Sequence, residues 1–432
     1  MKLSLFVVMY KYFGPLLFIL DYYLVSQQIA AVTPKKHQMK LVDERFETIN
    51  FKEDYNIIVL TFPTGYATRA YEIADEFKKL GKIVVMADYH ASLMPDEAIK
   101  HADSVLIGEV ELIWPQLLKD YENGKLKQFY KQEEPVDPAI IPPADREIIK
   151  KYHRPLARIQ ATRGCPIACE FCRIPAFEGK TYRKRPVENV IKEIKSIKQK
   201  ILFFADGSLT LDPEYAKSLF KSMKGLRKRF FCCGNADVLA KDDELLKLAR
   251  KAGCIAWYIG FESANQKTIN LLNKNTNIVK EYKAAVDKIH KNGSAVCGSF
   301  IVGFDNDSFE DFDKIIDAMY NLKLDHIELN MLTPFPGTPL FERLDKEGRI
   351  LTKNWFHYRE GQSGTKVAFQ PKNMTCDELA TEGRQRIFEH WYGGGEVNKK
   401  EYRHKKFGFI LEGLEIGFYP FIYRVFGFFF HL

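Results

Sequence analysis

The sequence predicts an α/β protein in which a doubly wound parallel unit precedes a partial (β/α)6 barrel and a helical C-terminal region. From about residue 150 to 345, short apolar runs alternate with amphipathic helical patterns, and a similar alternation fills the chain upstream. A length of 432 residues suggests about two to four domains. We therefore expect domains at 1–145, 150–345 and 346–432.

In the N-terminal unit, apolar runs at 39–44, 57–62, 83–87 and 104–107 are expected to be parallel strands. Between the second and third runs, one helical face carries Ala67, Ala70, Tyr71, Ala74 and Phe77. A first strand and helix are expected within 3–25, where charged residues, a glycine and a proline interrupt the apolar run and argue against a membrane span. Doubly wound units bind ligands at the carboxyl ends of their strands.

Six strands are expected in the barrel, at 157–161, 201–205, 230–236, 255–260, 295–303 and 326–330. Helical faces separate them, for example the one with Val187, Val190, Ile191, Ile194 and Ile197. Six such units form an open barrel rather than a closed eightfold one. Active sites of barrels of this kind lie at the carboxyl ends of the strands.

Three cysteines follow the first barrel strand, Cys165, Cys169 and Cys172, in a C-x-x-x-C-x-x-C spacing. Thiolates are the usual ligands of iron–sulfur clusters, and three ligands leave one iron of a 4Fe–4S cube open to bind a small molecule. The alternatives are a three-cysteine zinc site or three core thiols. Structural zinc normally takes four ligands from spaced C-x-x-C pairs, and no second pair is present.

The composition is that of an ordinary globular protein, with 46% hydrophobic and 28% charged residues and a net charge of +8. Its basic residues are scattered, and no RNA-binding module is recognisable, so a nucleic-acid partner is not expected. Eight cysteines in so long a chain do not form a secreted disulfide framework, which favours a reduced cytoplasmic setting. Four further cysteines lie in or beside apolar strand-like runs, where a thiol usually acts as a small buried hydrophobic group: Cys232, Cys233, Cys254 and Cys297. Cys376 is the single cysteine of a polar segment.

The cysteine spacing, with aromatic Phe171 before the last cysteine, resembles that of the radical S-adenosylmethionine (SAM) superfamily. The resemblance implies that SAM chelates the open iron and is cleaved to a 5′-deoxyadenosyl radical. Cysteines for a second cluster are absent both before Cys165 and in the C-terminal region, which disfavours the methylthiotransferase subclass and predicts a single cluster.

Further SAM contacts are implied at the ends of the later strands. Asp206, Gly207 and Ser208 occupy the position of the family's amino-group motif, although the sequence is ADGS rather than glycine–glycine–glutamate. Glu262 is placed to reach a ribose hydroxyl. The segment 298–304 resembles the family's adenine-contacting segment, with Ser299, Ile301 and Gly303 as candidates. The proline-rich segment 332–339 suits a rigid loop over the pocket. Taken singly, each of these residues also fits a turn or strand end without a ligand.

The upstream unit, with the segments LVDE, RAYEIADEF and IGEVE, resembles the cobalamin-binding domain of cobalamin-dependent radical SAM enzymes, and this likeness covers most of residues 1–345. Many such domains carry D-x-H-x-x-G after the first strand. Here Asp88-Tyr89-His90 follows a later strand with Leu93 in place of the glycine, so His90 is expected in a loop or at a pocket edge. Relatives without the histidine tend to show a glycine pair before Tyr89, where this chain has Ala87-Asp88.

The C-terminal end combines a basic cluster (Lys399, Lys400, Arg403, Lys405 and Lys406) with an aromatic segment at 407–432. One interpretation is peripheral membrane contact through 399–432, in which basic side chains meet anionic headgroups. The other is a helix docked on the enzyme's own surface.

The leading hypothesis is a radical SAM C-methyltransferase with a 4Fe–4S cluster, SAM and cobalamin. It would act on an unactivated carbon of a hydrophobic substrate, such as a lipid, isoprenoid or tetrapyrrole, or of a secondary metabolite, and would take its electron from flavodoxin or ferredoxin. The alternatives are cobalamin-independent oxidation, cyclisation or rearrangement on the same scaffold, which the Ala87-Asp88 departure favours, and a non-catalytic iron–sulfur or zinc protein docking at membranes. An RNA-modifying enzyme is a fourth option.

Overall fold

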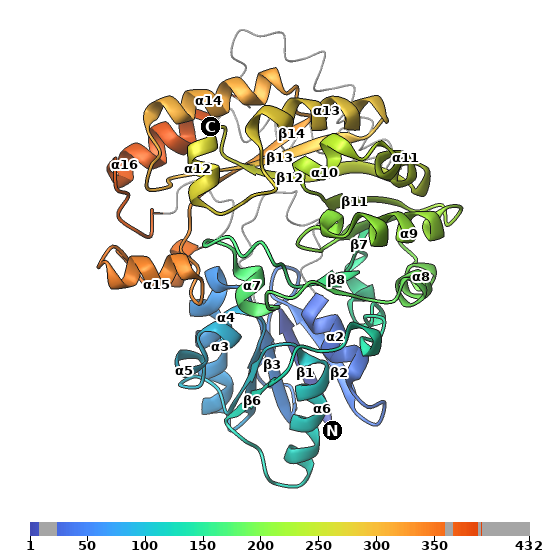
Figure 1. The fold of residues 1–432 in the computed structure, drawn as a ribbon. Coiled ribbons are helices and arrows are strands. Elements are labelled where there is room, and N and C mark those ends of the chain that lie inside the picture. Colours follow the sequence, from blue (N-terminus) through green and yellow to red (C-terminus); the bar gives the residue numbers. More distant parts are fainter. Residues whose placement is uncertain (8–23, 359–365, 388–389, 391–432) are drawn as a thin grey trace.

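The computed structural model describes residues 1–7, 24–358, 366–387 and 390 (Figure 1). The predicted basic and aromatic tail at 399–432 and most of the predicted first helix lie outside the described residues. Within them, the chain forms two parallel six-stranded sheets, one in the N-terminal unit and one in the barrel.

The N-terminal sheet has the strand order β2-β1-β3-β4-β5-β6, with every neighbouring pair parallel. Its strands are β1 (Lys2–Val7), β2 (Gln38–Asp43), β3 (Ile57–Thr61), β4 (Ile83–Ala87), β5 (Ser104–Ile107) and β6 (Phe129–Lys131). All five residues of β3 are buried, as expected for a strand covered on both faces. The chain builds the sheet in one direction from β1 to β2 and in the opposite direction from β3 onward, so the switch point lies between β1 and β3. Doubly wound units bind ligands at this point.

The helices of this unit are α2 (Leu24–Val32), α3 (Ala67–Lys79), α4 (Tyr89–Leu93), α5 (Pro95–Ala98) and α6 (Val110–Glu122). The face predicted for α3 is the buried one, since Ala67, Ala70, Tyr71, Ala74 and Phe77 are all buried. The four strands predicted between 39 and 107 are present, and β1 supplies the expected first strand.

The second sheet runs in the sequence order β7-β10-β11-β12-β13-β14 and is likewise parallel throughout. Its strands are β7 (Leu156–Ile159), β10 (Ile201–Phe204), β11 (Arg229–Cys233), β12 (Cys254–Glu262), β13 (Ala295–Val302) and β14 (His326–Met331). No pairing joins β7 to β14. The six strands of the predicted open barrel are therefore present in the expected order.

Helices cover the outer face of this sheet, as Figure 1 shows. They are α8 (Val187–Ser196), α9 (Pro213–Met223), α10 (Ala236–Lys241), α11 (Asp243–Ala252), α12 (Gln266–Leu271), α13 (Tyr282–Lys291) and α14 (Phe309–Asn321). Local signals fix their ends. For α11, the Asp242 side chain accepts from the Leu245 amide at 2.9 Å, and Gly253 ends the helix at φ 108°.

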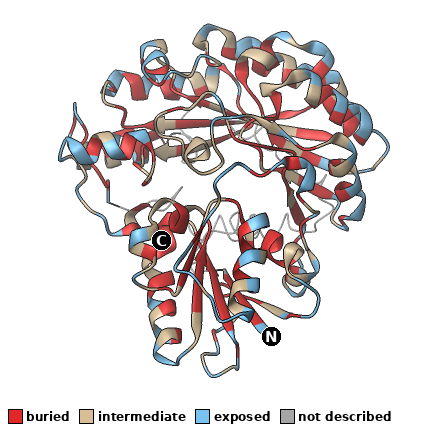
Figure 2. Cartoon of the chain, turned by 60° about the horizontal axis from the view of Figure 1, so that its bottom comes forward, coloured by how far each residue is buried: buried red, intermediate tan, exposed pale blue. Residues whose placement is uncertain are grey.

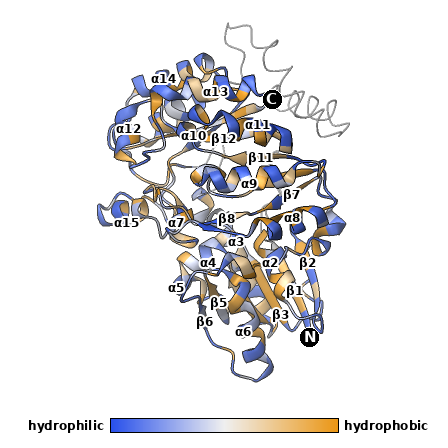
Figure 3. Cartoon of the chain, turned by 45° about the vertical axis from the view of Figure 1, so that its right-hand side comes forward, coloured by the Kyte–Doolittle hydropathy of each residue, from blue (hydrophilic) through white to orange (hydrophobic). Residues whose placement is uncertain are grey.

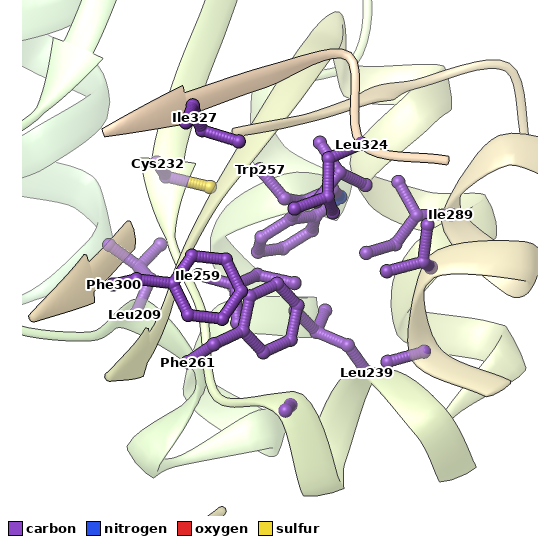
Figure 4. Packing of buried hydrophobic residues seen from close by; sticks show 14 of the residues in the cluster. Leu209, Cys232, Leu239, Trp257, Ile259, Phe261, Ile289, Phe300, Leu324 and Ile327 are labelled. Carbon is purple, nitrogen blue, oxygen red and sulfur yellow. The ribbon is translucent and has the colours of Figure 1, made fainter. Parts of the chain in front are cut away.

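Each unit has its own core (Figure 2). In the barrel, the outer faces of the strands pack against the helices, as Trp257, Phe261 and Phe300 do in Figure 4. Hydrophobic strands lie inside hydrophilic helix surfaces in both units (Figure 3). This layering leaves the inner face of the barrel sheet to be covered by something other than its helices.

The segment after the barrel returns to the N-terminal unit. It holds α15 (Pro339–Lys346), and Phe341, Trp355 and Tyr358 belong to the N-terminal core. Further on, α16 (Cys376–Glu378) leads into a π-helical turn (Leu379–Gln385) that packs on β13 and β14. Among the described residues, no helix combines the length and apolar character needed to cross a bilayer.

Candidate active site

A short antiparallel ribbon closes the base of the cysteine loop. Its strands are β8 (Thr162–Arg163) and β9 (Arg183–Lys184), so the chain between them, 164–182, forms one loop that includes α7 (Arg173–Phe177). Gly164 adopts φ 77°, and a Cβ there would overlap the backbone oxygen of Thr181. A glycine is therefore required at the residue before the first cysteine.

All three cysteines of the motif lie in this loop. Cys169 is buried, and Cys165 and Cys172 are partly buried. The Cys172 amide donates to the Cys169 carbonyl at 3.0 Å, and Ala168 takes the left-handed φ of 51° that this turn needs. Burial raises the pKa of Cys169 to about 12 and of Cys172 to about 11, and the neighbouring thiols add to both shifts. The thiols thus share one electrostatic environment.

The donor chemistry of this loop fits an iron–sulfur cluster. Among the described residues, no three His, Cys, Asp or Glu side chains converge as a single ion would require. A 4Fe–4S cube instead takes its cysteine ligands on separate irons. Three thiols on one loop can supply such ligands.

Asp206, Gly207 and Ser208 follow β10 beside the cysteine loop. A Cβ on Gly207 would lie 3.9 Å from the Cys165 Cβ. The Asp206 Oδ1 accepts from the Ala161 amide at 2.9 Å and from the Thr162 amide and hydroxyl, so this carboxylate anchors the chain that enters the loop. Its Oδ2 is buried without a hydrogen-bond partner, and burial raises the pKa of Asp206 to about 7.

Ser208 is occupied within the protein. Its hydroxyl bonds the Asn235 side chain and lies 3.1 Å from the Thr210 hydroxyl. Ser208 therefore caps a turn and joins the ends of β10 and β11.

Glu262 lies at the end of β12 in an ion pair with Lys274. It adopts φ 61°, and the Lys274 ammonium also donates to the Gly260 carbonyl at 2.7 Å. Burial acts to lower the pKa of Lys274, but the Glu262 carboxylate together with Cys169 and Cys172 outweighs it, and the pKa is raised. The Lys274 charge also interacts with Cys169 and Cys172, which places this pair beside the cysteine loop. The sequence reasoning missed Lys274, since it lies in a loop twelve residues downstream of Glu262.

The candidates on β13 occupy different environments. Ser299 is buried and bonds Tyr258, while Ile301 is partly buried. A Cβ on Gly303, at φ 105°, would lie 2.8 Å from the Leu379 side chain, so the close approach at this glycine is to the π-helical turn. Phe171 packs on Phe304 with ring centroids 5.9 Å apart.

A buried ionic network joins the cysteine loop to the N-terminal unit. The Arg163 guanidinium donates to Glu109 at 2.8 Å and to Glu111 at 2.6 Å, and Arg183 donates to Glu109 at 2.9 Å. Glu178, in the same loop, accepts from the Gly164 amide at 2.9 Å. None of these residues was predicted, because ion pairs between distant segments leave no pattern in one sequence.

The carboxyl end of β4 faces the same loop. Asp88 has φ 89° and ψ −175°, a conformation that is essentially restricted to glycine. Its carboxylate accepts from the Tyr89 amide at 2.8 Å, and burial raises the pKa of Asp88 to about 6. Tyr89 stacks on Phe177 at 4.2 Å, and Arg173 lies 4.9 Å from the Tyr89 ring.

The segment after β14 is covered by the N-terminal unit. Gly337, within the proline-rich loop 332–339, has φ 75°, and a Cβ there would lie 2.7 Å from the Leu93 side chain. The loop thus contacts α4.

His90 is not in a loop or at a pocket edge, as the sequence suggested, but fully buried. Its Nε2 lies 3.0 Å from the Tyr71 hydroxyl, and its ring is 5.0 Å from that of Trp355. Burial lowers the pKa of His90. The segment that returns after the barrel supplies Trp355 and so encloses this histidine, which no local pattern could reveal.

Comparison with known proteins is consistent with this geometry. Residues 159–319 match the sequence model of the Radical SAM superfamily. The chain is 32% identical over 392 residues to bacteriochlorophyllide d C-12(1)-methyltransferase of Chlorobaculum tepidum, a match that covers 86% of this chain and 83% of the relative. It is 33% identical to bacteriochlorophyllide d C-8(2)-methyltransferase of the same organism, over 76% of this chain and 77% of the relative.

Among solved structures, the cobalamin-dependent SAM radical enzyme OxsB, with aqua-cobalamin and SAM bound, superposes with a TM-score of 0.71. That match covers 96% of this chain and 71% of OxsB at 15% identity. The two proteins therefore share the arrangement of a doubly wound unit and a barrel.

Proposed function

The chain belongs to the radical SAM superfamily, and on that premise we propose that it is a cobalamin-using C-methyltransferase of a hydrophobic small molecule. The superfamily works with a 4Fe–4S cluster and SAM, and this chain is an enzyme of that kind. When bound, these groups supply a carbon-centred radical that removes a hydrogen atom, and cobalamin supplies the methyl group.

Cys165, Cys169 and Cys172 are the proposed cluster ligands. Gly207 lies beside Cys165, and Asp206 holds the entry to the loop in place. The Glu262–Lys274 ion pair lies beside the thiols, and we propose that it faces the polar groups of SAM. The nucleoside is proposed to be enclosed by Ser299, Ile301, Gly303 and Phe171. Of these, Ser299 also hydrogen-bonds the Tyr258 side chain.

Cobalamin is proposed to bind at the carboxyl ends of the strands of the N-terminal sheet, the edge at which a doubly wound unit holds its ligands. At the end of β4, Asp88 has a backbone conformation that is essentially restricted to glycine, and its side chain takes up the space that a glycine would leave open. Tyr89 and the loop after β5 contact the cysteine loop from this side.

The observation that carries the proposal is the cysteine loop itself, three thiols held at a barrel's active end against a doubly wound unit. Methyltransferase names among the relatives support methyl transfer. A flavodoxin or ferredoxin is the proposed electron donor, and a hydrophobic substrate agrees with the substrates those relatives are named for.

The test is anaerobic reconstitution with iron, sulfide and hydroxocobalamin, followed by an absorption spectrum and an assay of 5′-deoxyadenosine after reduction with SAM. We expect a bound corrin and 5′-deoxyadenosine from the wild type and from C376A, whose cysteine lies outside the motif. C169A should lose the cluster absorption. Iron loading without SAM cleavage would refute the proposal.

A second candidate keeps SAM cleavage and omits methyl transfer. It is favoured by the Ala87-Asp88 pair, because the buried Asp88 side chain occupies the place where related sequences have glycine. In this case the reconstituted protein forms 5′-deoxyadenosine and retains no corrin.

A further inference from the structure

The turn between the second and third cysteines of the motif is held from outside by α15. Glu170 lies in this turn, directly after Cys169. Its backbone oxygen accepts from the Leu340 amide, in the first turn of α15, at 3.0 Å. Its carboxylate accepts from Arg343, further along the same helix, through Nη2 at 2.9 Å and Nε at 3.3 Å. One helix therefore binds both the backbone and the side chain of a residue that lies between two proposed cluster ligands.

The Arg343 guanidinium also reaches the end of β13. Its Nη1 donates to the Asp305 carboxylate at 2.8 Å. Asp305 follows Phe304, and the Phe304 ring packs on that of Phe171, the residue after Glu170, with centroids 5.9 Å apart. The cysteine turn and the end of β13 are thus joined twice, by a pair of rings and by Arg343. The contact with Asp305 fixes the guanidinium in the orientation in which it binds Glu170.

Helix α15 is itself fixed between the two units (Figure 1). Its Leu340 and Leu344 side chains belong to the barrel core, whereas Phe341 belongs to the core of the N-terminal unit. Gly337, just before the helix, lies against Leu93 of α4. Because apolar side chains anchor α15 on both units, its guanidinium extends toward the cysteine turn from a fixed backbone.

The charges of Glu170 and Arg343 have opposite effects on a cluster bound by the neighbouring thiols. The reduction potential of an iron–sulfur cluster depends on the charge around it. Reduction adds an electron, so a nearby carboxylate opposes it and a nearby guanidinium favours it. The Glu170 and Arg343 side chains are 31% and 34% exposed, so solvent screens these effects without removing them. The pair as a whole is neutral, which means that Arg343 offsets the charge that Glu170 brings next to Cys169.

We propose that Arg343 is a positioning residue for the cluster: it holds the turn at 169–172 through Glu170 and offsets the charge of that carboxylate, so that the cluster accepts its electron more readily. This inference rests on the proposed function and adds to it a residue outside the cysteine loop. An ion pair that served only the stability of the fold would affect unfolding or iron loading. Changes at its two members would not then move the reduction potential in opposite directions.

The test is a redox titration of the reconstituted protein without SAM, followed by electron paramagnetic resonance, which gives the midpoint potential of the cluster. R343Q removes the cation and leaves Glu170 charged, so its midpoint potential should be lower than that of the wild type. E170Q removes the acid and leaves Arg343 charged, so its potential should be higher. The double variant E170Q/R343Q is again neutral and should lie between the two single variants.

K353Q is the matched control, because it removes a cation from another ion pair of α15. Lys353 lies 3.1 Å from the Asp345 carboxylate. K353Q changes the net charge as R343Q does and should keep the wild-type potential. If R343Q loads no iron, R343K takes its place beside E170Q. Lysine keeps the charge without the two parallel donors, so R343K should keep the wild-type potential and load less iron than the wild type.

Midpoint potentials that shift in the same direction in R343Q and E170Q, or that equal the K353Q value in both, would overturn the inference. Where R343K replaces R343Q, full iron loading of R343K or an unchanged potential in E170Q would do so. Production of 5′-deoxyadenosine is measured on wild-type samples of the same preparation. SAM cleavage with unchanged potentials in the variants refutes only the role of Arg343, whereas iron loading without SAM cleavage in the wild type refutes the proposed function.

Discussion

The unpartnered oxygen of Asp206 makes D206N an informative change. The Oδ1 accepts three hydrogen bonds from Ala161 and Thr162, while Oδ2 is buried with none. Burial raises the pKa of Asp206 to about 7. An unfolded chain releases this proton near its ordinary pKa of about 3.9. The folded state therefore binds the proton more tightly, and its stability falls as the pH rises from about 4 through about 7.

A rise of about three pKa units corresponds to roughly 4 kcal/mol above pH 7. The amide of D206N keeps an oxygen for the three donors and never ionises. Below pH 5 the amide NH2 of D206N and the protonated carboxyl OH of the wild type both lie in the Oδ2 position without a hydrogen-bond partner. The two proteins should therefore be of similar stability there. At pH 8 we expect D206N to be more stable by about 2–4 kcal/mol.

Urea denaturation of the cofactor-free protein, followed by circular dichroism at pH 5 and pH 8, measures both quantities. D206A is the control. It loses all three hydrogen bonds and should be destabilised at pH 5 by about 2–3 kcal/mol. A stability difference between D206N and wild type that is the same at both pH values would refute the reasoning.

Three further changes test other parts of the structure. G164A should distort the cysteine loop and reduce the iron content after reconstitution. G179A carries a similar backbone strain, at φ 88°, but its Cβ meets open space, so it should lose much less iron. Equal iron content in the two variants would contradict the steric argument. E111Q removes the charge of one carboxylate partner of the buried Arg163 side chain. The free energy of unfolding, measured by urea denaturation, should fall by about 3 kcal/mol. A loss below about 1 kcal/mol would mean that water reaches the ion pair. Because the pKa of His90 is lowered in the folded state, wild-type stability should fall as the pH drops below about 6.5, and H90Q should lack that part of the decline.

Most of the fold follows from local patterns. The strands β3, β4 and β5 were predicted from apolar runs longer than three residues, since burial on both faces leaves a continuous signal. The strand β6 was missed because only Tyr130 of its three residues is buried, which leaves no periodicity to detect. The residues of β1 were expected only within a longer apolar segment.

The site was predictable only in part. Cysteine spacing is local, so the loop was found. The environment of Asp206 and the pairing of Glu262 with Lys274 depend on how separate strand ends meet, and a single sequence does not encode that meeting in any pattern. His90 shows the same limit, since Trp355 arrives from a segment more than 250 residues away.

The ion pairs of Arg163 with Glu109 and Glu111 have a consequence for the biogenesis of the enzyme. The ribosome releases the N-terminal unit first, and domains fold in that order. The acids are therefore in place before the cysteine loop emerges, and the loop acquires its shape by docking on them. Iron delivery in the cell must follow this docking, and residues 150–345 produced alone should accept little iron even though they include every cysteine of the motif.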